Sequence, residues 1–194
     1  MEPILPPGTG WIEVICGGMF SGKTEELLRR VRRAQIAGQK VFLFKPDIDT
    51  RYHPLEVVSH DQNSLQAYPV PNSDSLYLMS SEADVVAVDE AQFFDEGIVE
   101  VVDRLADEGK RVIIAGLDMD YCGRPFGPMP SLMAIAEFVT KLHAVCTRTG
   151  LLAHYSYRRV RSEGTILPGG AEIYEPVSRK AFYELGAKCR DGLL

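Results

Sequence analysis

Short apolar runs alternate along this chain with longer segments in which apolar residues recur at every third or fourth position. The longer, amphipathic segments 24–37, 97–108 and 130–139 predict helices, the first of which ends before Gly38. Strands that alternate with helices are typical of a parallel sheet with right-handed crossovers. We therefore expect an α/β fold in which helices flank a parallel sheet. The short runs predict its buried strands at 11–16, 40–44, 84–90, 111–116 and 141–145.

Residues 55–80 are less regular, and we expect short strands near 56–59 and 66–70 with turns around 69–74. The preceding loop, 45–53, is dense in polar groups. It follows a predicted strand, at the edge where ligands bind in open α/β sheets. Arg51 in this loop is a candidate catalytic residue that would face a phosphate, and a surface role is also compatible with its position.

The chain has 194 residues, which suits one domain with a small appendage. We expect 1–10, rich in proline and glycine, to be a flexible tail. We expect 11–145 to be the α/β domain. After Cys146 the chain becomes rich in aromatic and basic residues and is too short for an independent core. We interpret 146–194 as a small subdomain that packs on the sheet edge and closes over the site as a lid.

Charge and cysteine content exclude several classes of protein. The formal net charge of -6 disfavours a sequence-independent nucleic-acid binder. The four cysteines are scattered without a C-x-x-C pair, which fits a reducing cytosol and no disulfide scaffold. No apolar run reaches the length of a membrane span or a signal peptide, so we expect neither a membrane partner nor secretion.

Four arginines, Arg29, Arg30, Arg32 and Arg33, lie on the predicted helix 24–37. They could form a patch for polyphosphate or nucleic acid, or a solvated helix face. The acidity of the whole chain favours the solvated face.

The strongest chemical motif is Gly17-Gly18-Met19-Phe20-Ser21-Gly22-Lys23-Thr24, which reads G-x-x-x-x-G-K-T, the phosphate-binding P-loop. Glycines let several backbone N–H groups converge on an anion, and a helix that starts near Gly22 adds its positive dipole end. Lys23 can reach the β- and γ-phosphates, and the Thr24 hydroxyl can bind Mg²⁺. The order of strand, loop and helix favours this interpretation over a glycine-rich turn with a surface lysine.

A second motif is the segment 84–90, in which the apolar run 85–88 is followed by Asp89 and Glu90, typical of a Walker B strand. A carboxylate at the strand tip can hold Mg²⁺ beside Thr24, and the second carboxylate stands where a general base is needed. Apolar strands also end in acidic turns without function, and a paired acid can be structural. The motif gains weight because it follows a P-loop.

These motifs and several others together resemble one family, the type II thymidine kinases, the cytosolic kind found in bacteria and animals. The resemblance covers about residues 11–187. It rests on G-G-M-F-S-G-K-T at 17–24, D-T-R-Y at 49–52, D-E-A-Q-F-F at 89–94, G-L-D-M-D-Y at 116–121, P-F-G at 125–127 and G-G-A-E-I-Y at 169–174.

The resemblance implies a P-loop NTPase (RecA-like) fold with a lasso loop at 165–174 in the C-terminal subdomain. It implies ATP as phosphate donor, Mg²⁺ at Thr24 and Asp89, and Glu90 as the base that takes the proton of the nucleoside 5′-hydroxyl. Arg158 also matches a family position without a defined role. The implied ATP site comprises Gly17, Gly18, Met19, Phe20, Ser21, Gly22, Lys23, Thr24, Asp89, Glu90, Ala91 and Gln92. The implied nucleoside site comprises Met19, Phe93, Leu117, Tyr121, Phe126, Ser156, Thr165, Leu167, Gly169 and Tyr174; the implied catalytic residues are Glu90, Lys23 and Arg51.

The family is usually a homotetramer inhibited by thymidine triphosphate, and we carry both over as expectations. Its structural zinc, held by two C-x-x-C or C-x-x-H pairs, has no counterpart here. The first pair reads Cys146-Thr147-Arg148-Thr149 and the second Ser178-Arg179-Lys180-Ala181. A closed zinc site needs four ligands, so we predict no zinc. We expect Leu151, Leu152, Phe182 and Tyr183 to hold the subdomain instead.

Two alternatives to a thymidine kinase remain at the level of sequence. A P-loop ATPase or GTPase switch would hydrolyse nucleotide without a nucleoside acceptor. A non-enzymatic nucleotide sensor would bind thymidine triphosphate without turnover. The complete set of Lys23, Thr24, Asp89 and Glu90 argues against the sensor, and the aromatic wall and lasso argue against the switch.

Overall fold

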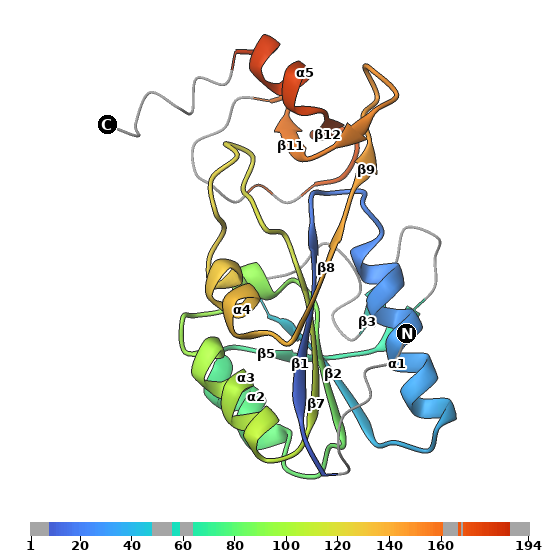
Figure 1. Ribbon diagram of the computed structural model, residues 1–194, viewed down its shortest axis with the longest axis vertical. Helices are drawn as coiled ribbons and strands as arrows, with labels where there is room; N and C mark the ends of the chain where they lie inside the picture. Colours follow the sequence, from blue (N-terminus) through green and yellow to red (C-terminus); the bar gives the residue numbers. More distant parts are fainter. Residues whose placement is uncertain (1–7, 48–55, 59–63, 161–166, 168, 187–194) are drawn as a thin grey trace.

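The computed structural model describes residues 8–47, 56–58, 64–160, 167 and 169–186 (Figure 1). Its strands are β1 (Trp11–Gly17), β2 (Val41–Pro46), β3 (Glu56–Val58), β4 (Ser64–Gln66), β5 (Tyr68–Val70), β6 (Val85–Val88), β7 (Arg111–Gly116), β8 (Phe138–Leu142), β9 (Ala144–Val145), β10 (Leu152–Ala153), β11 (Tyr155–Arg158) and β12 (Tyr174–Val177). Its helices are α1 (Lys23–Ile36), α2 (Ser73–Met79), α3 (Ile98–Asp107), α4 (Met129–Ile135) and α5 (Arg179–Glu184), with a 3₁₀ turn, η1, at Ala91–Phe93.

The centre of the molecule is a six-stranded, all-parallel sheet in the order β5-β2-β6-β7-β1-β8. Helix α1 covers one face, and α2, α3 and α4 cover the other (Figure 1). The predicted α/β fold with a parallel sheet is therefore confirmed. Strand β7 lies between β1, which leads into the P-loop, and β6, which leads into Asp89. The two predicted phosphate motifs thus emerge at the same edge of the sheet.

Alternation along β1 divides its side chains between the two faces. Ile12, Val14 and Cys16 pack with α3 and α4, whereas Ile15 packs with α1. Glu13 lies among these buried residues at 4% exposure. It is compensated by two guanidinium groups, Arg30 of α1 and Arg111 of β7, each 2.7 Å from one of its carboxylate oxygens.

The ion pair between Arg30 and Glu13 corrects the prediction that the arginines of α1 form a solvated helix face. Arg29 and Arg33 are exposed, as a solvated helix face requires. The Arg30 side chain is only 14% exposed and also donates to the Thr140 hydroxyl at 3.0 Å. Arg30 therefore fastens α1 to the sheet.

Between 69 and 145 the structure differs from the sequence predictions in two regions. Turns were expected around 69–74, and the chain does bend at 71–72, but the predictions missed helix α2 at 73–79, whose first turn is capped by the Asn72 side chain accepting the Ser75 N–H at 2.9 Å. The predicted helix 130–139 ends at Ile135. Phe138 to Leu142 form β8 and pair with β1, so tertiary pairing and the β propensity of Phe138-Val139-Thr140 override the helical pattern. The expected last strand, 141–145, is accordingly divided between β8 and β9.

The C-terminal elements build a third apolar cluster around Tyr155, Val177 and Phe182, against which Phe20 and Met119 pack from the first part of the chain. In Figure 1 these elements, β9 to α5, stand beyond the carboxyl ends of the sheet strands. The division of the chain at residue 145 stays a prediction. Among the described residues, every helix is too short or too polar to cross a membrane.

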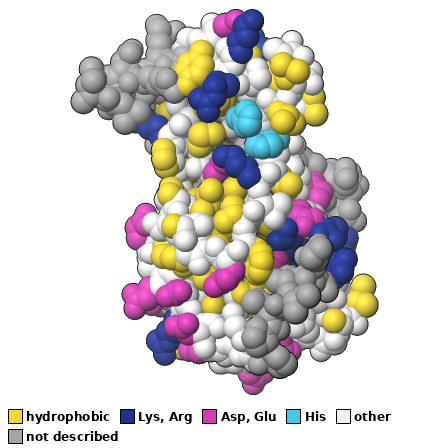
Figure 2. Space-filling view, viewed as in Figure 1, with side chains coloured by type: hydrophobic (Ala, Val, Ile, Leu, Met, Phe, Trp, Pro, Cys, Tyr) yellow, Lys and Arg dark blue, Asp and Glu magenta, His cyan; other side chains and the backbone are white. Residues whose placement is uncertain are grey.

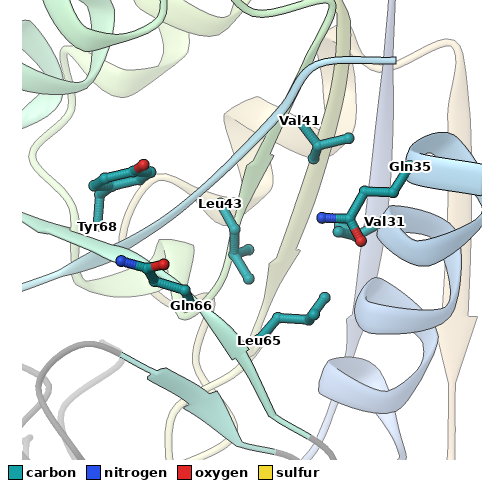
Figure 3. A pocket seen from close by; sticks show the side chains of 7 residues that line it. All are labelled: Val31, Gln35, Val41, Leu43, Leu65, Gln66 and Tyr68. Atoms are coloured by element: carbon teal, nitrogen blue, oxygen red, sulfur yellow. The ribbon is translucent and has the colours of Figure 1, made fainter. Parts of the chain in front are cut away.

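A pocket lies between the C-terminal half of α1, strand β2 and the β4–β5 segment (Figure 3). Val31, Gln35, Leu43 and Tyr68 are among its lining residues. Gln35 is eleven residues after Thr24, which places it about 16 Å along the helix from the P-loop. This pocket is therefore separate from the predicted phosphate site.

Candidate active site

The P-loop has the backbone shape that its glycines permit. Gly17 and Gly22 have φ of +141° and +85°, and a Cβ on Gly17 would lie 2.2 Å from the Leu142 carbonyl oxygen. Side chains of the loop close back on its backbone, because the Ser21 hydroxyl and Lys23 Nζ each donate to the Gly18 carbonyl at 2.8 Å. Gly22 caps α1, so the positive end of the helix dipole points into the loop.

Thr24 and Asp89 meet although 65 residues separate them. The Thr24 hydroxyl donates to Asp89 Oδ2 at 3.2 Å, which joins the P-loop to the end of β6. Burial, together with the charge of Glu90, raises the pKa of Asp89, and Lys23 and Thr24 work against this rise. A buried carboxylate beside a hydroxyl is a pair of hard oxygen donors, which is the chemistry that Mg²⁺ prefers.

Glu90 directly follows Asp89 and has a left-handed backbone with φ of +54°, rare for a residue with a side chain. The Gln92 amide donates to the Glu90 carboxylate, and its oxygen accepts the Leu117 N–H at 2.9 Å. Gln92 is only 3% exposed. The buried Gln92 amide thus holds both the Glu90 carboxylate, which is the predicted base, and the backbone of Leu117 at the end of β7.

The predicted nucleoside wall is partly assembled by aromatic contact. The rings of Phe93 and Phe126 pack edge to face with centroids 5.6 Å apart. Phe126 and Tyr121 belong to the loop between β7 and α4, where Asp120 Oδ1 accepts the backbone N–H groups of Cys122 and Arg124 at 2.8 and 2.9 Å. This turn holds Tyr121 at its tip.

Three contacts come from the C-terminal elements. The Ser156 hydroxyl accepts the Met19 N–H at 2.9 Å, and the Arg158 guanidinium carbon lies 3.6 Å from the centroid of the Tyr121 ring. The Tyr174 hydroxyl donates to the Leu167 carbonyl at 2.7 Å, within the predicted lasso. Gly169 is part of the same segment, and a Cβ there would lie 2.2 Å from Ile173 Cδ1.

Arg51 and Thr165, two predicted site residues, lie outside the described residues. Sequence analysis gave no role to Asp118, which the structure buries to 6% exposure between Leu117 and Met119. Lys141 Nζ lies 2.7 Å from its Oδ2. The only signal in the sequence was its place after a buried strand, in the loop that carries Tyr121.

The four positions that correspond to the family's zinc ligands form a hydrogen-bonded cluster. Burial alone would raise the pKa of Cys146, but bonds with the Thr149 hydroxyl and with the backbone of Ser178, Arg148 and Thr149 lower it to about 7. The Ser178 hydroxyl accepts the Ala181 N–H at 3.4 Å and caps α5. Within the described residues no three His, Cys, Asp or Glu side chains gather to hold a metal; the lack of zinc stays a prediction.

The apolar contacts expected around this cluster are only partly as predicted. Phe182 is buried and stacks on Tyr155 with ring centroids 4.3 Å apart, and Tyr183 packs against both rings. Leu151 and Leu152 are 67% and 59% exposed, because Leu151 ends the β9–β10 turn and Leu152 points away from the cluster, opposite to the buried Ala153 that follows it in β10. The prediction for these two leucines is wrong.

Two histidines lie together near the positive charges of Lys141 and Arg179. His143 and His154 pack edge to face with centroids 4.5 Å apart (Figure 2, cyan). Burial, then the positive charges of His143, Lys141 and Arg179, lowers the pKa of His154.

Comparison with known proteins identifies the arrangement. The family model described as thymidine kinase matches residues 10–182. A protein of Porphyromonas gingivalis named thymidine kinase is 60% identical over 173 residues, which cover 89% of this chain and 85% of that protein. Proteins with the same name from Rhodothermus sp. and Bacteroides fragilis are 55% and 56% identical, and the matches cover 94% and 89% of this chain and 87% of each relative. The chain therefore belongs to the thymidine kinase family.

Proposed function

We propose that this enzyme transfers the γ-phosphate of ATP to the 5′-hydroxyl of thymidine, and also of deoxyuridine, with Glu90 as the general base. Family membership supports the reaction. The observation that carries the residue assignment is the hydrogen bond between Thr24 and Asp89, which brings the two phosphate motifs together directly before Glu90. A nucleotide switch without a nucleoside acceptor is not favoured, because the relatives are named thymidine kinases.

On the donor side, the amides of 17–24 and the N-terminus of α1 bind the phosphates of ATP, and Lys23 stabilises the charge of the transferring group. We assign the same electrostatic role to Arg51. The Thr24 hydroxyl and the Asp89 carboxylate fit Mg²⁺, which neutralises phosphate charge when bound.

On the acceptor side, Glu90 takes the proton of the 5′-hydroxyl as that oxygen attacks the γ-phosphate. The bond from Gln92 orients its carboxylate, so that catalysis comes from positioning and charge stabilisation. Phe93, Leu117 and Phe126 enclose the base, with Tyr121 and Tyr174. The backbone of the 165–174 lasso reads the edge of thymine, and cytosine presents the opposite donor and acceptor pattern.

Glu90→Gln tests this assignment, with Glu96→Gln as the matched control on an exposed residue nearby. ADP release is measured with Mg·ATP and thymidine, deoxyuridine, deoxycytidine or no nucleoside. We expect release that depends on thymidine and is absent with deoxycytidine. Glu90→Gln should bind both substrates and lose about 10²- to 10⁴-fold in kcat, the usual contribution of a general base. Normal turnover of Glu90→Gln would remove the base assignment, and equal release in all four reactions would indicate a hydrolase.

We further propose that the chain works in the cytoplasm as a homotetramer, without nucleic-acid or membrane partners, and that thymidine triphosphate inhibits it as the end product. We also propose that 146–194 form a subdomain that closes the nucleoside site. The family resemblance supports these statements. The mass of the assembly in solution tests the homotetramer, and inhibition of ADP release by thymidine triphosphate tests the end-product inhibition.

A further inference from the structure

Strand β11 (Tyr155–Arg158) presents different side chains to its two sides. Because side chains alternate along a strand, Ser156 and Arg158 point to one side and Tyr155 to the other. Tyr155 stacks on Phe182 of α5 and thereby anchors the strand in the C-terminal cluster. The opposite side of β11 carries Ser156 and Arg158, which contact the P-loop and the loop after β7.

Ser156 contacts the phosphate-binding loop directly. Its hydroxyl accepts the Met19 N–H at 2.9 Å, and a Cβ on Gly18 would lie 3.2 Å from the same oxygen. Ser156 is only 5% exposed, so water does not compete for this bond. One peptide of the loop is therefore oriented by a side chain of β11.

Arg158 contacts the loop that carries the predicted nucleoside wall. Its guanidinium carbon lies 3.6 Å from the Tyr121 ring centroid, well within the range of cation–π stacking. The same loop meets the strand again at Gly123, where a Cβ would lie 2.9 Å from Tyr155 Cε1. The position of the Tyr121 ring is thus set by β11.

We propose that Ser156 and Arg158 are positioning residues that couple the two substrate sites through β11. The proposal rests on the proposed function, because it takes 17–24 as the donor loop and Tyr121 as a wall of the nucleoside pocket. A substrate that fixes either loop also fixes the strand, and so prepares the other loop. Each substrate then raises the affinity for the other by the same factor, as thermodynamic linkage requires.

The test compares thymidine binding with and without a non-hydrolysable ATP analogue and Mg²⁺; the ratio of the two dissociation constants is the coupling factor. Ser156→Ala should reduce this factor by about fivefold, the typical effect of one hydrogen bond, and Ser156→Thr should restore it because the hydroxyl remains. Arg158→Gln should raise the KM for thymidine about three- to thirtyfold, with a smaller change in the KM for ATP.

Two matched variants serve as controls. Arg159→Gln makes the same change at the next residue, which pairs with Glu175 at 3.3 Å. Ser178→Ala removes a hydroxyl that caps α5. Both should keep the coupling factor and the thymidine KM of the wild type.

An unchanged coupling factor in Ser156→Ala would overturn the inference, and so would equal effects of Arg158→Gln and Arg159→Gln on the thymidine KM. Neither result would affect the proposed function as long as the wild type turns over thymidine normally. A wild-type enzyme whose ADP release did not depend on thymidine would overturn both.

Discussion

Two buried glutamates of this enzyme, Glu13 and Glu175, are paired with guanidinium groups, and each pair fixes an element. Burial would raise the pKa of Glu13, but hydrogen bonds and charge from Arg111, with Trp11 and Arg30, outweigh it and hold the pKa below its ordinary value. Glu175 of β12 is 4% exposed and receives bonds from Thr147 and Arg148. Arg148, then Thr147 and Arg159, lower the pKa of Glu175 to about 2 against the opposing effect of burial.

This pKa predicts acid sensitivity. In the unfolded chain the Glu175 carboxyl has its ordinary pKa of 4.5, so the folded chain binds this proton less tightly than the unfolded chain does. The stabilisation is therefore complete above about pH 4.5 and is lost as the pH falls toward 2. Glu175→Gln should lower the free energy of unfolding at pH 7 by about 1–2 kcal/mol, a modest figure because the guanidinium groups are about half exposed.

Thermal unfolding of the wild type and Glu175→Gln from pH 7 to pH 3 measures this effect. The difference in Tm should shrink as the pH falls through the window given above. Glu184→Gln, on an exposed face of α5, is the matched control. A difference in Tm that stayed constant with pH would contradict the assignment.

At the scale of elements, helix ends depend on backbone shapes that only some residues adopt. Helix α1 ends in a Schellman motif, in which the Gly38 N–H donates to the Gln35 carbonyl at 3.0 Å and the Gln39 N–H to the Ala34 carbonyl at 3.1 Å. Gly38 has φ of +79° and no atom within 4 Å of its would-be Cβ. Its requirement for glycine is therefore conformational rather than steric.

Gly38→Ala should destabilise the protein by about 1 kcal/mol, the cost of the left-handed backbone for a residue with a Cβ. Gly38→Asn should lose less, because asparagine tolerates this conformation. Chemical denaturation of the three proteins gives the comparison. Equal stability of the alanine and asparagine variants would show that the helix ends in another way.

For the whole molecule, the C-terminal elements carry much of the predicted nucleoside site and are held by hydrogen bonds and aromatic packing. The Cys146–Thr149–Ser178 cluster, the Ser178 cap and the Tyr155–Phe182 stack together provide this support. None of these contacts requires a metal.

Metal removal should therefore leave the fold unchanged. We expect purified enzyme to contain no stoichiometric zinc, and its Tm to be the same with and without a strong chelator, whereas a protein that relies on structural zinc unfolds when the metal is removed. Turnover should still require added Mg²⁺. Stoichiometric zinc by elemental analysis, or a chelator-dependent loss of Tm in the absence of substrates, would contradict this prediction.

The sequence alone determined the parallel α/β sheet, the P-loop, the acidic strand end and the family, because each depends on local periodicity or on a contiguous motif. It predicted strands such as 11–16 and 111–116 within one residue, since buried parallel strands read as unbroken apolar runs. It failed where local pattern and tertiary contact disagree, as in β8, whose pairing with β1 overrides the helical periodicity of 130–139.

Tertiary structure alone decided which side chains meet. Three contacts could not be predicted, because their partners lie 17 to 137 positions apart in the sequence. In these contacts Thr24 donates to Asp89, Arg30 neutralises Glu13, and Ser156 accepts the Met19 N–H. Alternation and helical pitch say which face a residue occupies, but not what packs against that face. Only the crossing of distant segments sets those distances, and the chemistry of the site depends on them.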